Sequence, residues 1–284
     1  MMNKPTVLFI AEPNHTSEIL SSDKFQNEFD ILKCQLSTKE LFLQFLKDHS
    51  SANIQAIYGG YPQFTCIGGL TRDLVYNEFF PRKQLKCITL CSRGYNSIDL
   101  DALRENEIQL FNYQDSKVST GMSPDQVGND VADCVLWHVL EGFRKFSFQQ
   151  AQLKLKKNTL TARSSASGKQ AGYAFGHELT KDGVSMMARA PRGEKCLILG
   201  LGSIGKQIGL KLHYGLGMEV HYCKTSEDPE ITQKYNWKYH SLDQSLKKKL
   251  SSFKTIVIAL PGTEQTTHLI DEDFLAHCDG PSLT

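Results

Sequence analysis

The sequence lacks an excess of either charge. Its 284 residues contain 32 Lys and Arg against 31 Asp and Glu, which gives a formal net charge of +1. A protein that binds nucleic acid or an anionic membrane through its overall charge needs a clear basic surplus. No apolar run approaches the roughly 18 residues of a membrane span, and the short run near the start ends at Glu12, too early for a secretory signal. We therefore expect neither a nucleic-acid partner nor a membrane partner.

Paired cysteine motifs are also missing. The eight cysteines include no C-x-x-C, and several lie in apolar, strand-like runs such as KCITLC and KCLILG. Buried free thiols are typical of a reducing compartment, so we expect a cytoplasmic protein. His177 and Glu178 begin a partial match to the zinc motif H-E-x-x-H, but Lys181 occupies the position of its second histidine. The sequence therefore predicts no metal site.

Strand-like and helix-like segments alternate along the chain. Short β-rich runs lie at 6–11, 56–60, 87–91 and 109–113, and a segment at 37–49 has apolar residues at helical spacing with Ser37 placed as its N-cap. A second alternation begins at Lys195, with apolar strands before Gly200, around 218–223 and at 254–262. Apolar strands between helices predict an α/β protein with parallel sheets covered on both faces.

A long helical pattern separates the two alternating regions. Ser123, Pro124 and Gln126 form a helix start, and apolar residues then recur every three or four positions as far as Phe146. The next stretch is rich in Ser, Lys, Gly and Ala without periodicity, which predicts an extended surface connection. We therefore place a first domain at 1–122, an interdomain helix at 123–148, a connecting segment at 149–192 and a second domain at 193–284.

The segment GLGSIGKQ at 200–207 fits two different nucleotide-binding motifs. Gly200, Gly202 and Gly205 form G-x-G-x-x-G, whereas Gly200, Gly205 and Lys206 form most of a P-loop. A P-loop requires Ser or Thr after the lysine to bind Mg²⁺, and this position is Gln207. A strand precedes the turn, a helix follows it and a second strand comes about 20 residues later, as in dinucleotide-binding domains. We therefore interpret the segment as a dinucleotide turn that includes Ser203 and Ile204.

The second strand of this domain ends without the acidic residue that binds the ribose hydroxyls in most NAD sites. Lys224 and Thr225 stand there instead. A lysine beside hydroxyl groups suits a 2′-phosphate, which favours NADP(H) over NAD(H) as the cofactor. In the alternative interpretation, Glu227 or Asp228 folds back onto the ribose and Lys224 is a solvated surface residue.

Several segments together resemble the D-isomer-specific 2-hydroxyacid dehydrogenase family, and most closely its fungal glyoxylate or hydroxypyruvate reductase-like members. The segments are LKCITLCSRGYNSIDLDAL, VADCVLWHVLEGFRK, LILGLGSIGKQIGLKLHYGLGMEVHY and VIALPGTEQTTHLI. The resemblance implies two Rossmann-like domains, a flavodoxin-like substrate-binding domain and a doubly wound NAD(P)-binding domain, in a homodimer. It also implies hydride transfer between nicotinamide and a small 2-oxo or 2-hydroxy acid such as glyoxylate or hydroxypyruvate.

The resemblance assigns roles to individual positions. Arg93 and Gly94 resemble the loop that binds the substrate carboxylate, although Arg93 also fits a surface arginine at a strand end. Pro261 and Thr263 resemble the loop that lies beside the cofactor. Asp99 and Asp133 fall on recurring acidic positions for which we expect structural roles.

The family's catalytic Arg, Glu and His have no counterpart before Thr284. We expect structural roles for His268 and His277, and therefore assign no catalytic residue. The second domain is expected to be incomplete and the chain to be a C-terminally truncated dehydrogenase without appreciable turnover. The alternative hypothesis is a non-catalytic dinucleotide-binding or scaffold protein on the same fold.

Overall fold

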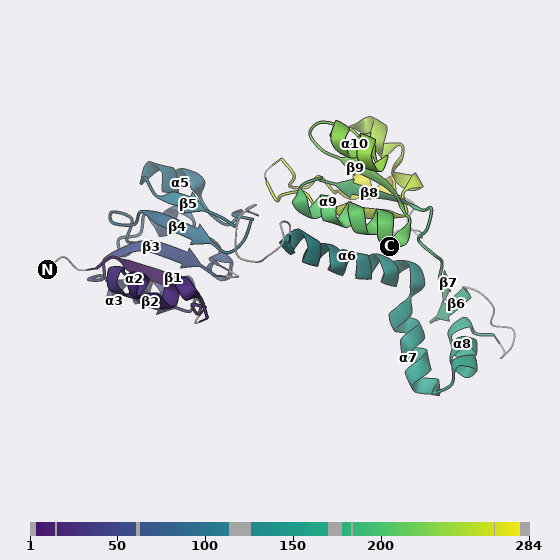
Figure 1. Cartoon of the computed structure of the whole chain (residues 1–284), viewed down its shortest axis with the longest axis horizontal. Coiled ribbons are helices and arrows are strands. Elements are labelled where there is room, and N and C mark those ends of the chain that lie inside the picture. Colours follow the sequence, from purple (N-terminus) through teal and green to yellow (C-terminus); the bar gives the residue numbers. More distant parts are fainter. Residues whose placement is uncertain are drawn as a thin grey trace. The chain divides into compact units, whose positions relative to one another are not determined.

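A computed structural model of the chain describes residues 4–14, 16–60, 63–113, 126–169, 178–182, 184–263 and 265–278. The chain divides into two compact units, Met1–Gln114 and Asp115–Thr284. Each unit contains a parallel β-sheet with its own hydrophobic core (Figure 1). The expected helix start at Ser123 and Pro124 lies outside the described residues.

The first unit contains a five-stranded parallel sheet with the strand order β2-β1-β3-β4-β5. This is the flavodoxin-like order, in which the chain reverses its winding direction between β1 and β3. The strands are β1 (Thr6–Ile10), β2 (Asp30–Cys34), β3 (Ile54–Gly59), β4 (Cys87–Leu90) and β5 (Gln109–Phe111). The helices are α1 (Glu18–Ser21), α2 (Asp23–Glu28), α3 (Lys39–Asp48), α4 (Arg72–Val75) and α5 (Leu100–Glu105).

The core of the first unit lies between its sheet and the helices. Leu8 on β1 and Ile57 on β3 are fully buried, and Phe42 and Leu46 on α3 pack in the same cluster. Thr38, rather than the expected Ser37, caps α3, because its side chain accepts a hydrogen bond from the Leu41 amide. The helix itself therefore occupies the predicted segment, with its cap one residue later.

The second unit contains a four-stranded parallel sheet with the order β10-β9-β8-β11. The chain reverses its winding between β8 and β11, which is the doubly wound arrangement of a dinucleotide-binding domain. The strands are β8 (Lys195–Leu199), β9 (Glu219–Cys223), β10 (Lys238–His240) and β11 (Thr255–Ile258). The helices are α6 (Gln126–Arg144), α9 (Ser203–Leu210), α10 (Pro229–Tyr235), α11 (Gln244–Lys247) and α12 (Glu272–Ala276), and a π-helical turn at Lys211–Gly215 extends α9.

Helices α6 and α9 lie side by side on one face of the second sheet (Figure 1). Gly128 on α6 allows the two helices to approach closely, because a Cβ built on it would stand 3.3 Å from the Ser203 carbonyl oxygen of α9. Farther along, Lys211 Nζ donates to the Asn129 carbonyl and to the Asp133 carboxylate. Asp133 therefore has a structural contact in the helix pair. None of the helices in the described ranges is long and apolar enough to cross a membrane.

The segment expected to be an extended connection contains regular structure instead. The long helix ends at Arg144, and Lys145, in the left-handed region at φ 54°, changes the chain direction. Helices α7 (Phe146–Lys156) and α8 (Thr159–Ser167) then pack together, followed by the antiparallel pair β6 (Glu178–Lys181) and β7 (Val184–Met187). Their core is small, with Ala166, Leu179 and Ala188 buried, which explains the weak apolar pattern of the sequence.

All eight cysteines are free thiols. Cys34, Cys196 and Cys223 are buried, and burial raises the pKa of the Cys34 thiol to about 11 and of the other two to about 12. The expectation of buried thiols is wrong for Cys66, Cys91 and Cys134, which are exposed. Cys66 lies in a 3₁₀ helix at Thr65–Ile67, Cys91 directly follows β4, and Cys134 is an exposed position of α6.

Candidate functional site

The glycine turn of the second unit lies at the carboxyl end of β8, beside the end of β11. Gly200 has φ +96°, and a Cβ built on it would stand 2.6 Å from the Ala259 carbonyl oxygen. A Cβ on Gly205 would stand 2.1 Å from the Gly200 carbonyl oxygen, so α9 packs directly on the turn. Both positions therefore require glycine, the first for its backbone conformation and close approach and the second for close approach alone.

Gly202 differs from the other two glycines because a Cβ built on it meets nothing within 4 Å. As the N-cap of α9 it has no side chain with which to cap the first amides of the helix. The buried Ser203 hydroxyl, next in the chain, has no hydrogen-bond partner among the described residues. Open space, uncapped amides and an unpaired hydroxyl at a helix N-terminus fit a pyrophosphate. Ile204 packs partly buried against the core of this unit.

The turn after β9 carries the predicted ribose-binding residues. Gly200 N–H donates to the Cys223 carbonyl at 3.0 Å, which fixes the end of β9 against the glycine turn. Lys224, Thr225 and Glu227 are exposed. Lys224 Nζ lies 3.0 Å from Asp228 Oδ2, and this contact, with an amide of α10, lowers the pKa of the Asp228 carboxyl. Asp228 is thus engaged by Lys224 and by the helix that it caps.

The loop after β11 is held together by a threonine that the sequence analysis did not single out. Thr266 Oγ1 donates to the Pro261 carbonyl at 2.6 Å and accepts from the Thr263 amide at 2.8 Å. The loop begins beside the glycine turn, since the Ala259 amide donates to the Leu199 carbonyl. Pro261 and Thr263 are both exposed there. Two threonines three residues apart in a polar loop are only a weak indication of a functional loop in a sequence, because turns stabilised by Ser and Thr side chains are common on protein surfaces.

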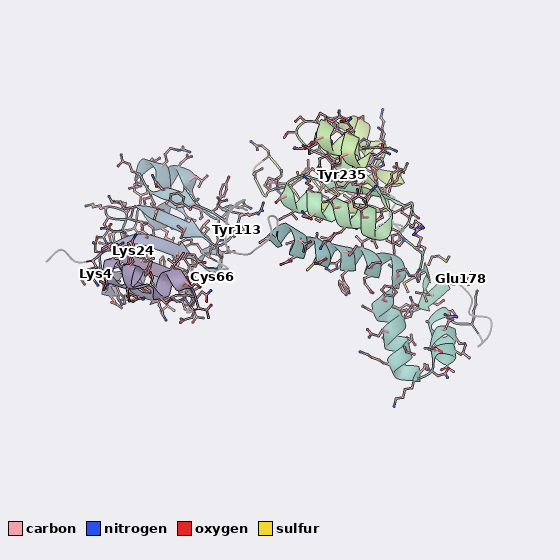
Figure 2. The ribbon with its side chains drawn as sticks, viewed as in Figure 1. Lys4, Lys24, Cys66, Tyr113, Glu178 and Tyr235 are labelled. Atoms are coloured by element: carbon pink, nitrogen blue, oxygen red, sulfur yellow. The ribbon has the colours of Figure 1, made fainter. Side chains whose placement is uncertain are left out.

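In the first unit, the Arg93–Gly94 loop follows β4 at the carboxyl edge of the sheet. The Arg93 guanidinium lies 6.0 Å from the centroid of the Tyr113 ring, and Arg93 is only partly exposed. Figure 2 labels Tyr113 and Cys66, which lie at this same end of the first unit. A Cβ built on Gly94 would meet nothing within 4 Å, so its backbone faces open space. Asp99 caps α5 by accepting from the Ala102 amide, which is a structural role.

The remaining candidates from the sequence are Glu178 and three histidines. Glu178 pairs with Lys169, and His177 lies outside the described residues. His268 is exposed with φ 56°, and His277 Nδ1 lies 2.7 Å from the Asp273 carbonyl. Within the described ranges, no group of three or more His, Cys, Asp or Glu side chains could hold a metal ion.

Comparison with known families matches most of the chain. Residues 39–166 match the family described as D-isomer specific 2-hydroxyacid dehydrogenase, catalytic domain. Residues 151–281 match the NAD binding domain of the same family. The two matches overlap at 151–166, in α7 and α8, and together they cover residues 39–281, so that β1 and β2 precede them.

Individual proteins give the same result. A Saccharomyces cerevisiae protein named as a 2-hydroxyacid dehydrogenase is 57% identical over 279 residues, covering 97% of this chain and 72% of that protein. Glyoxylate/hydroxypyruvate reductase B of Enterobacter agglomerans is 27% identical, covering 68% of this chain and 49% of that protein. The holo crystal structure of Rhodotorula graminis D-mandelate dehydrogenase has the same fold, with a TM-score of 0.73 at 24% identity, covering 98% of this chain and 71% of that one.

Proposed function

The chain belongs to the D-isomer specific 2-hydroxyacid dehydrogenase family of oxidoreductases, and from this premise we propose that its substrate is a small 2-oxo acid of the glyoxylate or hydroxypyruvate kind. The family's second domain binds a nicotinamide dinucleotide, which supplies the hydride when bound. The observation that supports hydride transfer from a bound dinucleotide is the glycine turn, in which two glycines allow close packing and Gly202 leaves open space at the N-terminus of α9. The choice of substrate rests on the similarity to glyoxylate/hydroxypyruvate reductase B.

The residues of the turn fit a bound dinucleotide. Gly202 leaves room for the pyrophosphate, and the first amides of α9 with the Ser203 hydroxyl offer donors to it. The loop at Pro261 and Thr263 would border the same crevice, because β8 and β11 are the strands between which the winding reverses. In this proposal the chain's residues bind and orient the dinucleotide and exclude water from one side of it.

We propose NADP(H) rather than NAD(H) as the preferred cofactor. Lys224 is an exposed cation at the end of β9, and Thr225 beside it adds a hydroxyl donor. The carboxylate of Asp228 already contacts Lys224 and caps the start of α10. A carboxylate held in this way is less able to accept from a ribose hydroxyl, whereas Lys224 can turn toward a 2′-phosphate.

We propose that the Arg93–Gly94 loop binds the substrate carboxylate. Gly94 presents backbone to open space, and the partly exposed Arg93 adds positive charge beside it. A backbone N–H that faces open space can donate to a carboxylate oxygen without the steric hindrance of a side chain. Both residues of this proposed carboxylate site belong to the first unit.

A titration followed by an assay separates the two function hypotheses. Residues 1–284 are mixed with NADPH, and the melting temperature is measured as a function of NADPH concentration; glyoxylate is then added and the nicotinamide absorbance followed. We expect stabilisation by NADPH under both hypotheses, and consumption of NADPH only if the chain is a dehydrogenase. Steady consumption at an ordinary enzyme rate would exclude the non-catalytic function. Binding without turnover would support the non-catalytic dinucleotide-binding or scaffold function.

We also propose a homodimer and a cytoplasmic location. The α7–β7 segment exposes large apolar side chains, and an exposed apolar cluster is typical of an association surface: Phe146, Leu153, Leu155, Leu160 and Met187. Analytical ultracentrifugation tests the dimer, which Leu155→Lys together with Leu160→Lys should dissociate. The eight free thiols support a reducing compartment such as the cytoplasm.

A further inference from the structure

The Arg93–Gly94 loop is held at three successive carbonyl groups. The Tyr113 amide donates to the Ser92 carbonyl at 2.9 Å, and Asn112 Nδ2 donates to the Arg93 carbonyl at 2.7 Å. The Ser92 hydroxyl donates to the Gly94 carbonyl at 2.7 Å. Because a peptide unit is planar, each fixed carbonyl also fixes the direction of the next N–H. The hydrogen bonds of Ser92 therefore help to decide where the amides of this loop point.

The hydroxyl of Ser92 receives a hydrogen bond from Gln63, a residue that follows β3. Gln63 Nε2 is the donor and Ser92 Oγ the acceptor. A serine hydroxyl has a single hydrogen to donate. Because the Gln63 amide occupies the acceptor side of Ser92, the hydroxyl hydrogen is directed to the Gly94 carbonyl. Gln63, Ser92 and Gly94 thus form one directed chain of hydrogen bonds.

The backbone conformation of Gln63 is unusual for a glutamine residue. Gln63 has φ 60°, in the left-handed region, and is 6% exposed. Glycine and asparagine adopt this conformation with less strain than glutamine. A strained residue persists where its surroundings hold it in place. At this position the side chain of glutamine reaches Ser92, which a glycine could not do.

The Gln63 side chain borders a cavity on one side. It lines a cavity of about 510 Å³ at the carboxyl ends of β1, β2 and β3, together with Ala11, Cys34, Gly60 and Cys66. A side chain beside a cavity has room for other rotamers, so its hydrogen bond decides its orientation. The bond to Ser92 is therefore the contact that selects one arrangement of the loop.

We infer that Gln63 is a positioning residue for substrate binding: by orienting Ser92 it sets the Gly94 carbonyl and thereby the loop amides that meet the carboxylate. The inference rests on the proposed function of the Arg93–Gly94 loop. It assigns Gln63 no contact with substrate. Its effect reaches the substrate only through the Ser92 hydroxyl.

The test follows the Gly94 amide resonance of the ¹⁵N-labelled 284-residue chain during titration with hydroxypyruvate. The wild-type resonance should shift and saturate. In Gln63→Leu, which keeps the bulk and cannot donate, the dissociation constant should rise by roughly fivefold to tenfold, the usual effect of losing one hydrogen bond. Gln35→Leu is the matched control, since Gln35 lines the same cavity and has no bond to Ser92.

A double-mutant cycle distinguishes positioning from a general loss of structure. In a Ser92→Ala background the substitution Gln63→Leu should cause no further loss of affinity, because the chain of hydrogen bonds through Ser92 is already absent. Gln63→Gly is a second variant, which removes the side chain but relieves the strained φ; it should bind hydroxypyruvate as weakly as Gln63→Leu without a lower melting temperature than wild type.

Three results would overturn the inference. One is wild-type affinity in Gln63→Leu and Gln63→Gly. Another is an equal loss of affinity from Gln63→Leu in the wild-type and Ser92→Ala backgrounds. The third, a wild-type Gly94 resonance that does not respond to hydroxypyruvate, would overturn the proposed carboxylate site itself and the inference with it.

Discussion

The carbonyl oxygen of Gly200 lies where a side chain on Gly205 would begin, 2.1 Å from the position of a Cβ built on that residue. The turn that follows β8 and the helix that contains Gly205 are therefore in direct backbone contact. Gly202, between them in the sequence, has open space instead. The same motif thus combines two glycines that packing requires with one that packing does not require.

This difference predicts that two alanine substitutions will have effects of very different size on stability. Gly205→Ala must displace backbone and should lower the free energy of unfolding by about 3 kcal/mol or more. Gly202→Ala should lower it by about 1 kcal/mol or less, because the added Cβ meets nothing and the only cost is that alanine is a poorer N-cap than glycine. Urea unfolding followed by circular dichroism measures both. Equal destabilisation by the two substitutions would contradict the packing account.

Gly209 and Trp237 form a second close contact in the same unit. A Cβ on Gly209 would stand 2.4 Å from the Trp237 ring, which is 1% exposed. Gly209→Ala should therefore destabilise the second unit by about 1–3 kcal/mol through overpacking. In a Trp237→Phe background, which provides room, the same substitution should be nearly neutral. Additive effects in this cycle, measured by urea unfolding, would mean that the ring and the glycine are not coupled.

The paired histidines predict a pH dependence of stability. His221 Nδ1 lies 2.7 Å from His240 Nε2, with Glu219, Lys238 and Lys249 as the neighbouring charges. Burial lowers both pKa values, that of His240 from 6.5 to about 4. Between these two pH values the unfolded chain binds more protons, so the free energy of unfolding should fall as the pH drops from 6.5 to 4.

The matched variant for this pH dependence is His240→Gln, which cannot be protonated in that range. Its stability should fall less steeply over the same interval, measured by urea unfolding at each pH. Above about pH 7.5 wild type and variant should show parallel stability, because both histidines are then largely deprotonated in the folded and the unfolded state. If the free energy of unfolding fell equally steeply below pH 6.5 in wild type and variant, the histidine pair would not be the cause of the pH dependence.

Lys224 predicts a selective effect on the two cofactors. Its Nζ lies 3.0 Å from Asp228 Oδ2 and is free to bond a 2′-phosphate only when that pair opens. Lys224→Ala should weaken NADPH binding roughly tenfold, the value of one charge-assisted hydrogen bond, and NADH binding far less. Asp228→Asn keeps a capping side chain but releases Lys224, and should strengthen NADPH binding. Equal losses for both cofactors in a fluorescence titration of Lys224→Ala would argue against a phosphate contact.

The strongest sequence patterns correspond to elements whose cause is local. Apolar runs such as TVLFI and KCLIL became the buried strands β1 and β8, and the glycine motif became a tight turn before a helix. In both cases the pattern contains its own physical reason, burial on both faces or a backbone that only glycine allows.

The elements absent from the sequence analysis depend on partners distant in the chain. β2 and β10 are edge strands of three to five residues with half-exposed side chains, so their apolar pattern is weak. Helices α7 and α8 share a small core. Because several of their leucines are exposed, the apolar residues do not fall on one helix face, and the sequence shows no clear helical periodicity. Gln63 and Ser92 are 29 residues apart, and no local rule connects them. Such relationships arise only when the strands are placed side by side.

The most direct test of the central claim is a calorimetric titration of NADPH into the 284-residue chain and its Gly202→Ala variant. We predict saturable binding of one NADPH per chain by wild type, and binding weakened tenfold or more in the variant, whose circular dichroism should show that it is folded. Saturable binding of equal strength in both proteins, or none in folded wild type, would contradict the assignment of the glycine turn as the dinucleotide site.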